Sequence, residues 1–258
     1  MRVFSQHKSH KIDEENPYWI SFSDLMSALL VVFILAVVAL IIELTEIKNE
    51  IEQTQEEIEK DIAQLKNANK ARKDILDEIK KELDEKGIIV FKDKNDKVLI
   101  IPEATLTFKS NSDQIPKGNK SRQIIKIIGE TLHSAINKEF DPGNDPRLRL
   151  DFLDTVFIEG HTDSLPTKRY RGGNWGLSSL RAIALWEFWG STVNLKPAFG
   201  DMVNLQGEKL FSISGYAATR RREPEEITKV QRASNRRIDI RFTVKRPKVY
   251  ELENIVAR

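Results

Sequence analysis

The chain has 258 residues, of which 31% are charged, yet its formal net charge is only +2. This near-balance argues against a nucleic-acid-binding domain, which is usually much more basic, so we expect no direct contact with nucleic acid. The sequence contains no cysteine, which excludes disulfides, thiolate metal sites and a lipid-modified N-terminal cysteine.

An apolar run, ISFSDLMSALLVVFILAVVALII, occupies residues 20–42 and holds a single charge. At 1.5 Å per residue a helix of this length reaches about 34 Å, enough to cross a hydrocarbon core of about 30 Å. No small-residue cleavage site follows it, so we expect a retained transmembrane helix rather than a signal peptide. The tail of residues 1–19 carries Arg2, Lys8 and Lys11. The positive-inside rule therefore predicts a cytoplasmic N-terminus, a single pass through the inner membrane and a periplasmic C-terminal part.

The one charged residue of this span is Asp24. Ser21 and Ser27 lie three residues away on either side and Ala28 lies four residues on, so a face of small and hydroxyl side chains surrounds it. A carboxylate held between partner helices can alternate between protonated and ionised states, as a proton carrier must. That role requires partner membrane helices. The alternative is an interfacial aspartate that reaches the headgroups or caps the helix.

The next segment, residues 43–87, is expected to be a periplasmic helical linker. Residues 44–86 contain neither proline nor glycine, and apolar residues recur at every seventh position except at Arg72, although the second stripe is incomplete. The sevenfold track consists of Leu44, Ile51, Ile58, Leu65, Arg72 and Ile79. This pattern predicts a weak or conditional coiled coil, and with it a homodimer. The alternative is a solvated spacer helix without a partner.

From residue 88 the sequence changes to short apolar runs that alternate with helical stretches, and we assign residues 88–246 to one domain and residues 247–258 to a tail. We expect strands at 87–91, 97–101, 155–159, 210–214 and 238–244, the first two joined by a turn at 93–96. One helix is expected at 119–137, with Ile124, Ile127, Ile128, Leu132 and Ala135 on its buried face. A second is expected to be capped by Ser178 and to turn Ala182, Leu185, Trp186 and Trp189 inward. The fold class predicted is α+β, a mixed sheet layered with helices.

Three segments of this domain carry a resemblance. They are Ile158-Glu-Gly-His-Thr-Asp163, Asn174-Trp-Gly-Leu-Ser-Ser-Leu-Arg-Ala182 and Asn235-Arg-Arg-Ile238. In their order, spacing and placement they resemble the OmpA-like peptidoglycan-binding domain, over roughly residues 88 to 246. The resemblance implies an OmpA-like mixed α/β sandwich whose ligand is the diaminopimelate-bearing stem peptide of the cell wall. It also implies that Asp163 and Arg181 hold the amino and carboxylate ends of the diaminopimelate, with further contacts from Asn174 and Arg236.

The residue chemistry agrees with this implication. A zwitterionic ligand needs a carboxylate and a guanidinium held a few ångströms apart, and arginine can hold a carboxylate in a bidentate fork. We place Asp163 after a strand end and Arg181 in the first turn of the next helix, so that both face one pocket. The alternative is a structural ion pair. His161 has no set of metal-ligating residues at suitable spacing, and we expect a structural hydrogen-bonding role for it.

The chain departs from the family in one stretch. Ser164-Leu165-Pro166 stands where the family often has glycine, and residues 167–173 form a longer basic loop whose contacts cannot be carried over. The run Arg220-Arg221-Arg222 could attract wall carboxylates or phosphates, but we expect a solvated loop.

The segment Pro17-Tyr-Trp-Ile-Ser-Phe-Ser-Asp24-Leu-Met-Ser-Ala-Leu resembles the B subunit of flagellar stator units. The serine-rich sequence of this segment, together with the long charged helix after it, is most similar to the B subunits of Zorya anti-phage systems. In stators, two B chains sit inside a ring of five multi-span A subunits, and the stretch after the span can act as a plug. The resemblance implies a wall-anchored B subunit of a proton-driven motor, with Asp24 as the proton carrier and with cytoplasmic effector proteins acting indirectly.

Two other functions remain open: a flagellar stator subunit that generates torque, and a passive wall anchor in which Asp24 moves no ion. An enzyme is not expected, since the sequence offers no nucleophile–base set, metal cluster or phosphate-binding loop. We expect no cofactor and no metal site.

Overall fold

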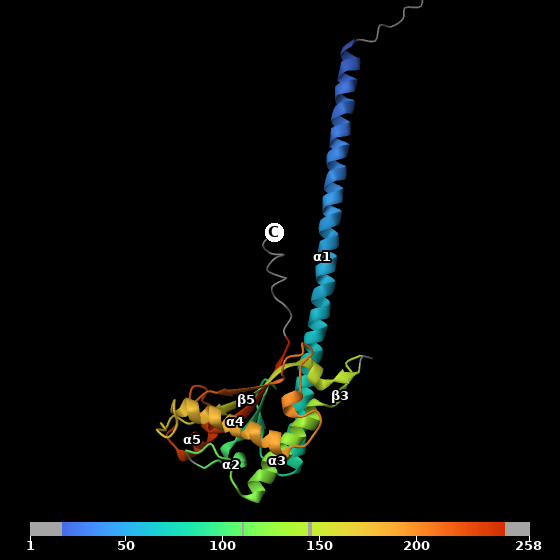
Figure 1. Cartoon of the computed structure of the whole chain (residues 1–258). Coiled ribbons are helices and arrows are strands. Elements are labelled where there is room, and N and C mark those ends of the chain that lie inside the picture. Colours follow the sequence, from blue (N-terminus) through green and yellow to red (C-terminus); the bar gives the residue numbers. More distant parts are fainter. Residues whose placement is uncertain (1–16, 110, 144–145, 246–258) are drawn as a thin grey trace, which may run out of the picture. The chain divides into compact units, whose positions relative to one another are not determined.

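The computed structural model describes residues 17–109, 111–143 and 146–245 (Figure 1). The basic tail residues Arg2, Lys8 and Lys11, and the predicted C-terminal tail of residues 247–258, lie outside this part of the chain. The chain divides into two compact units, residues 1–60 and residues 61–258, which are taken separately below.

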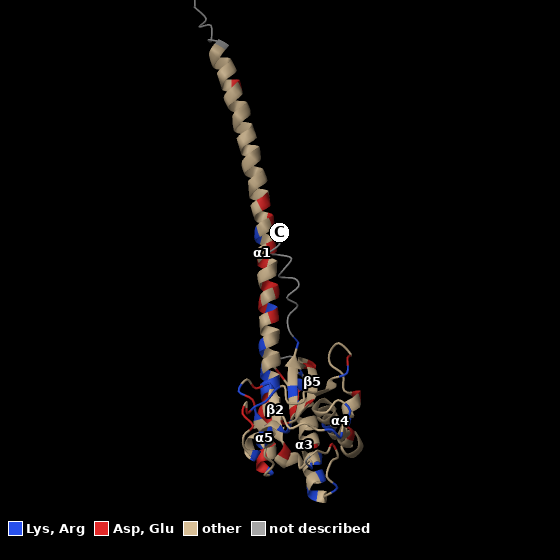
Figure 2. Cartoon of the chain, turned by 90° about the vertical axis from the view of Figure 1, so that its left-hand side faces the viewer, with Lys and Arg blue, Asp and Glu red and all other residues tan. Residues whose placement is uncertain are grey.

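The first unit consists of the N-terminal part of helix α1, which runs without a break over Pro17–Glu85. Among the described residues this is the one helix long and apolar enough to cross a membrane, and its most apolar window has a mean hydropathy of 3.3 with none of it buried. The predicted span of residues 20–42 is helical throughout, as expected, and Asp24 lies exposed within it. Figure 2 shows how few charged residues this stretch carries compared with the rest of α1. Within the part of the chain that the structure describes, the apolar side chains of this stretch are exposed, whereas those of a core helix in a soluble protein are mostly buried.

The second compact unit begins inside α1, at Asp61. Ile75, Leu76, Ile79 and Leu83 of this helix are fully buried and belong to the main hydrophobic core. The last two residues of the sevenfold track, Arg72 and Ile79, are therefore buried inside the second unit and cannot form a seam between two chains. Arg72, expected on that seam, is buried and donates from Nε to the carbonyl oxygen of Asp96 at 2.9 Å.

A five-stranded mixed sheet forms the centre of this unit, in the order β1-β2-β7-β5-β6. Its strands are β1 (Phe91–Lys92), β2 (Val98–Pro102), β5 (Leu153–His161), β6 (Phe211–Gly215) and β7 (Arg237–Val244). β5 and β6 run parallel, and all other neighbours are antiparallel. The expected hairpin at 87–101 is confirmed, although β1 has only two residues. Asp93 closes its turn, because Oδ1 accepts from the backbone N–H groups of Lys97 and Val98, both at 2.7 Å.

Helices α3 (Asn119–Ile136) and α4 (Asn174–Thr192) lie side by side against one face of this sheet (Figure 1). Residues of β7 alternate, so that Ile238, Ile240 and Phe242 enter the core while Arg237, Asp239 and Arg241 share the opposite face. Ile125, missing from the predicted face of α3, is fully buried, whereas Ile124 and Ile127 are partly buried. Three further elements were not predicted from the sequence: α2 (Glu103–Leu106), α5 (Lys229–Asn235) and the small sheet of β3 (Glu139–Phe140) and β4 (Arg147–Leu148).

Two paired glycines let α4 lie directly on the backbone of the sheet. Gly160 at the end of β5 and Gly215 at the end of β6 are register partners. A Cβ on Gly160 would lie 2.0 Å from the carbonyl oxygen of Ser178, and one on Gly215 would lie 2.2 Å from Oγ of Ser179. Both distances are far too short for real atoms, so this packing requires glycine at both positions.

The expectation that Ser178 caps α4 is wrong. The helix begins one turn earlier, at Asn174, because Gly172 and Gly173 adopt positive φ angles of 80° and 60° and turn the chain into the helix. Ser178 instead lies fully buried inside the helix. Its Oγ accepts from the N–H of Ala217 at 3.0 Å and donates to the carbonyl oxygen of Trp175 at 3.0 Å.

Replacing Gly160 with alanine should destabilise the second unit, because the new methyl group must push α4 off the sheet. Overpacking of this kind lowers the free energy of unfolding by about 1–3 kcal/mol, or by more when the added group clashes with backbone atoms. Gly190 is the matched control, since it lies in α4, the helix that packs on Gly160, and has nothing within 4 Å of an added Cβ. Gly190→Ala should be neutral or stabilising by up to about 1 kcal/mol. Thermal unfolding of the full chain in detergent measures both, and equal midpoints for the two variants would refute the packing argument.

Candidate ligand-binding site

A hollow of about 450 Å³ opens where the loop after β5 meets the start of α4 and the short helix α5. Its walls contain all four predicted site residues. The lining residues of this charged hollow are Asn111, Thr162, Asp163, Leu165, Pro166, Thr167, Asn174, Leu177, Arg181, Lys229, Arg232 and Arg236. Folding thus brings together four predicted residues that are up to 73 positions apart in the sequence.

Asp163 is mostly buried at the end of the β5 segment, and Arg236 holds its carboxylate. Arg236 donates from Nη1 to Oδ2 of Asp163 at 2.6 Å and from Nε to Oε2 of Glu103 at 2.6 Å. Oδ1 of Asp163 accepts from the N–H of Leu165 at 3.3 Å. Burial alone would lower the pKa of Arg236, but its hydrogen bonds to the two carboxylates outweigh burial and raise the pKa. Arg236 therefore stays charged in the hollow.

Arg181 lies two turns inside α4, rather than in the first turn as expected, because α4 begins at Asn174. It is buried and donates from Nε to the carbonyl oxygen of Ser112 at 2.9 Å and from Nη2 to that of Lys109 at 3.3 Å. Nη2 also lies 3.7 Å from Oε1 of Glu103. Burial lowers the pKa of Arg181, and nearby Glu103 opposes that effect.

The two residues expected to grip the ligand do not contact each other directly. An ionic chain runs from Asp163 through Arg236 and Glu103 to Arg181. Arg236 and Glu103 balance each other's charge, which leaves Asp163 and Arg181 as the negative and positive ends of this chain. The hollow therefore offers a carboxylate and a guanidinium that are separated yet line the same space.

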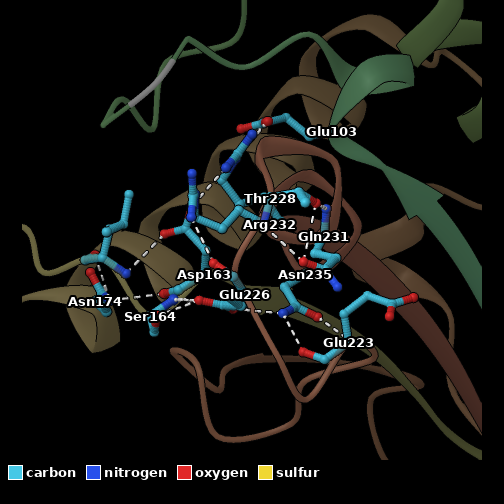
Figure 3. A network of polar contacts seen from close by, with 12 residues as sticks. Glu103, Asp163, Ser164, Asn174, Glu223, Glu226, Thr228, Gln231, Arg232 and Asn235 are labelled. Carbon is cyan, nitrogen blue, oxygen red and sulfur yellow. Dashed lines mark hydrogen bonds and ion pairs between the residues drawn. The ribbon is translucent and has the colours of Figure 1, made fainter.

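Asn174, the first residue of α4, braces the loop between β5 and the helix. Its Nδ2 donates to the carbonyl oxygens of Asp163 at 3.1 Å and Leu165 at 3.0 Å, and its Oδ1 accepts from the N–H of Thr167 at 3.2 Å. Both ends of the amide are engaged with backbone groups. The side chain thus lines the hollow mainly by shaping the loop that carries Asp163 (Figure 3).

Glu226 binds Ser164, which lies where the chain departs from the OmpA-like sequence pattern. Its carboxylate accepts from the N–H of Ser164 at 2.7 Å, from the hydroxyl of Ser164, and from Nδ2 of the buried Asn235 at 2.6 Å (Figure 3). Burial alone would raise the pKa of Glu226, but these hydrogen bonds lower it below its ordinary value of 4.5. Ser164 is thereby tied to the segment before α5.

Several residues at this site were not predicted from the sequence. Glu103 links two site arginines but stands 133 positions from Arg236, and no local pattern signals such a contact. Thr162 lies within the Gly-His-Thr-Asp segment, and its buried Oγ1 has no hydrogen-bond partner among the described residues. Lys229 and Arg232 come from the unexpected helix α5. The polar run around Asn235 was the only feature of the sequence that pointed to a contribution from Lys229 and Arg232.

His161 lies on the opposite face of the sheet, and the expectation that it has no ligand set nearby is wrong. Glu159 and Asp239 each place a carboxylate oxygen within 4.8 Å of it and of each other. Arg237 donates from Nε to both oxygens of Asp239 at 3.0 Å, and Arg241 donates from Nε to Glu159 at 2.8 Å. These guanidinium groups satisfy the carboxylates and would repel a metal ion, which favours a structural role for His161.

Solved structures with a similar arrangement include proteins from three bacteria. A Desulfovibrio vulgaris protein described as MotB-like has 15% identity and a TM-score of 0.49, over 70% of this chain and 99% of its own. The cell wall anchor of the T6SS from Pseudomonas aeruginosa has 20% identity and a TM-score of 0.44, over 66% and 97%. The periplasmic domain of Helicobacter pylori MotB has 16% identity and a TM-score of 0.43, over 65% and 88%.

No protein-family model matches the chain, and no curated protein matches it significantly. The function must therefore be inferred from the chain's own residues.

Acid should weaken the second unit through Glu226. Because the pKa of Glu226 is lower in the folded chain than in the unfolded one, its ionised form stabilises the fold. That contribution is complete above about pH 4.5 and is lost as the pH falls through the folded-state pKa. Glu226→Gln should therefore lower the unfolding midpoint at pH 7, and the difference from wild type should shrink as the pH falls below about 4.5.

The neighbouring Glu225 supplies the control, since it makes no hydrogen bond or ion pair with the described residues. Glu225→Gln should track wild type at every pH. If the unfolding midpoint of Glu226→Gln stayed below that of wild type by the same amount from pH 7 to pH 4, the stabilising role of ionised Glu226 would be contradicted.

Proposed function

We propose that the charged hollow binds the diaminopimelate-bearing stem peptide of peptidoglycan, and that this chain is the wall-anchored B subunit of a proton-driven inner-membrane motor. The observation that carries the proposal is the placement of Asp163, Arg181 and Arg236 in the wall of one hollow. A diaminopimelate end carries an ammonium and a carboxylate on one carbon. Asp163 suits the ammonium, and the arginines suit the carboxylate.

The charge of the hollow supports a ligand with several carboxylates. Its lining holds one acidic residue, Asp163, and four basic ones: Arg181, Lys229, Arg232 and Arg236. A stem peptide offers more carboxylates than ammonium groups, so its net charge complements this excess of cations. The ligand ammonium would take over the carboxylate that Arg236 now holds, and Arg236 would be freed to meet a ligand carboxylate. Binding would thus be an exchange of ionic partners within a preformed site.

The membrane part of the proposal rests on helix α1. The large apolar side chains between Tyr18 and Leu44 are exposed in this chain, which suits a lipid or protein surround rather than water. Asp24 is the single charge in that stretch, and the residues around it resemble the stator B-subunit segment. We propose that it carries protons beside a multi-span A-type subunit, in a complex of five A and two B chains. A homodimer of this chain, with a cytoplasmic N-terminus and a periplasmic second unit, would then be held against the wall.

The output of such a motor follows from the closer resemblance to Zorya systems, so we propose anti-phage defence through cytoplasmic effector proteins. A flagellar stator subunit that generates torque is the alternative with the same site chemistry. A passive anchor is the alternative in which Asp24 has no ionic role.

Sedimentation with purified cell-wall sacculi tests the wall-binding proposal. Wild-type chain in detergent should pellet with sacculi, and free diaminopimelate should compete. Asp163→Asn keeps the size of the side chain but removes its charge, and Arg181→Ala removes the guanidinium. Each variant should weaken binding at least about tenfold, because a buried charge-assisted contact contributes about 1.5–3 kcal/mol.

The matched control is Lys168→Ala, because Lys168 is exposed in the neighbouring basic loop and does not line the hollow. It should pellet like wild type. Full binding by a folded Asp163→Asn variant would refute this site.

Replacement of Asp24 separates the motor from the passive anchor. In cells that also carry the multi-span partner, Asp24→Asn should abolish function, because an amide cannot cycle a proton, while Asp24→Glu should retain part of it. Phage plating and proton uptake by reconstituted vesicles are the readouts. Both variants should still bind sacculi. Intact function with Asp24→Asn would establish the passive anchor instead.

A further inference from the structure

A second hollow, of about 750 Å³, adjoins the charged hollow and has no role in the function proposed above. It is lined by Asn174, Trp175, Ala217, Ala218, Thr219, Arg221 and Pro224, and we refer to it as the aromatic hollow. Asn174 lines both hollows, so they are neighbours across one side chain. Both volumes fall within the range of about 300–1,000 Å³ that is typical of small-ligand sites.

Trp175 lines this hollow with a large aromatic side chain, and 53% of the residue's surface is exposed. The turn before it is tightly specified: a Cβ on Gly176 would lie only 2.2 Å from the carbonyl oxygen of Arg171. The N–H of Trp175 donates to the carbonyl oxygen of Gly172 at 3.2 Å. This turn fixes the first residues of α4, so the aromatic ring stands on a rigid base rather than on a loose loop.

The floor of the aromatic hollow is also rigid, and it is connected to the charged hollow. Ala217 is a buried non-glycine residue with a positive φ of 48°. Its N–H donates to Oγ of Ser178 at 3.0 Å, and its carbonyl oxygen accepts from the N–H of Thr162 at 2.9 Å. Thr162 lines the charged hollow. Backbone held in a sparsely populated conformation by several contacts is a feature of ligand sites.

Three of the lining residues have polar side chains, namely Asn174, Thr219 and Arg221. Arg221 donates from Nε to the carbonyl oxygen of Ala218 at 3.1 Å and from Nη1 to that of Pro224 at 3.3 Å, which holds its guanidinium plane in place. Arg221 is the single charged residue in the lining. A flat aromatic face with a few fixed polar groups suits a ligand with an apolar face and a polar edge.

A pyranose ring has that form, because its C–H groups face an aromatic plane while its hydroxyl and acetamido groups point outward. In the wall, the stem peptide branches from such a ring through a lactyl ether. The lactyl group and two residues separate the ring from the diaminopimelate, a reach of about 10 Å when extended. A peptide seated in the charged hollow can therefore place its parent sugar in the adjoining one.

We propose that the aromatic hollow binds the sugar of the glycan strand that carries the stem peptide, with Trp175 stacking on its ring. This inference rests on the proposed wall-binding function. The chain would then recognise the branch point of the wall polymer, sugar and peptide together, rather than the peptide end alone. Arg221 would donate to the acetamido or lactyl oxygens at the edge of the ring.

Calorimetry with two ligands tests this inference. One ligand is the free stem tripeptide that ends in diaminopimelate, and the other is the disaccharide that carries the same tripeptide. The full chain in detergent should bind the disaccharide–peptide about tenfold more tightly than the free peptide. Trp175→Ala should lose that advantage while binding the free peptide as wild type does, and Trp175→Phe should keep most of it.

Leu180 supplies the control, because it is a partly exposed apolar residue of the same helix that lines neither hollow. Leu180→Ala should leave both affinities unchanged. Equal wild-type affinities for the two ligands, or an equal loss for both in Trp175→Ala, would overturn the inference while the peptide site stands. Failure of wild type to bind either ligand would overturn the proposed function and this inference with it.

Discussion

The site depends on the contact between α4 and the backbone of two parallel strands. Gly160 and Gly215 lack side chains at the place where Ser178 and Ser179 lie. Three residues beyond Gly160 the chain reaches Asp163, and three residues beyond Ser178 it reaches Arg181. A strand end and a helix turn that touch at backbone distance therefore carry their charged side chains into one space. Any larger residue at either glycine would separate those side chains along with the elements that hold them.

Within that space, the charged groups satisfy one another before any ligand arrives. Arg236 neutralises Asp163 and Glu103 together, and two carbonyl oxygens and Glu103 hold Arg181. A buried charge without a partner would be costly, so this chain of contacts lets the hollow keep its shape when empty. The binding free energy of a ligand is therefore only the difference between the contacts it makes and the contacts it displaces. This favours specific and reversible recognition.

Much of this could be predicted from the sequence, because the informative patterns were local. The apolar run at 20–42, the alternation at 238–244 and the three motif segments each depend on neighbours in sequence, and the four motif residues do line one hollow. The misses were long-range. The burial of Ile79 in the domain core depends on strands that follow it, and the roles of Glu103 and Asp239 depend on partners from distant segments. Ser178 was misassigned because a serine near a helix start signals a cap, and sequence cannot reveal that two glycines place it in the core.

The shortness of β1 has a consequence for how copies of the chain can associate. A sheet that ends in a long, flat strand exposes a row of unpaired N–H and C=O groups on which another molecule can add a strand, the usual route to aggregation. Here the outermost strand on that side has two residues, and Lys92 brings a charge to it. This edge is therefore a poor template for strand addition, so neighbouring copies of the chain have little backbone through which to join their sheets.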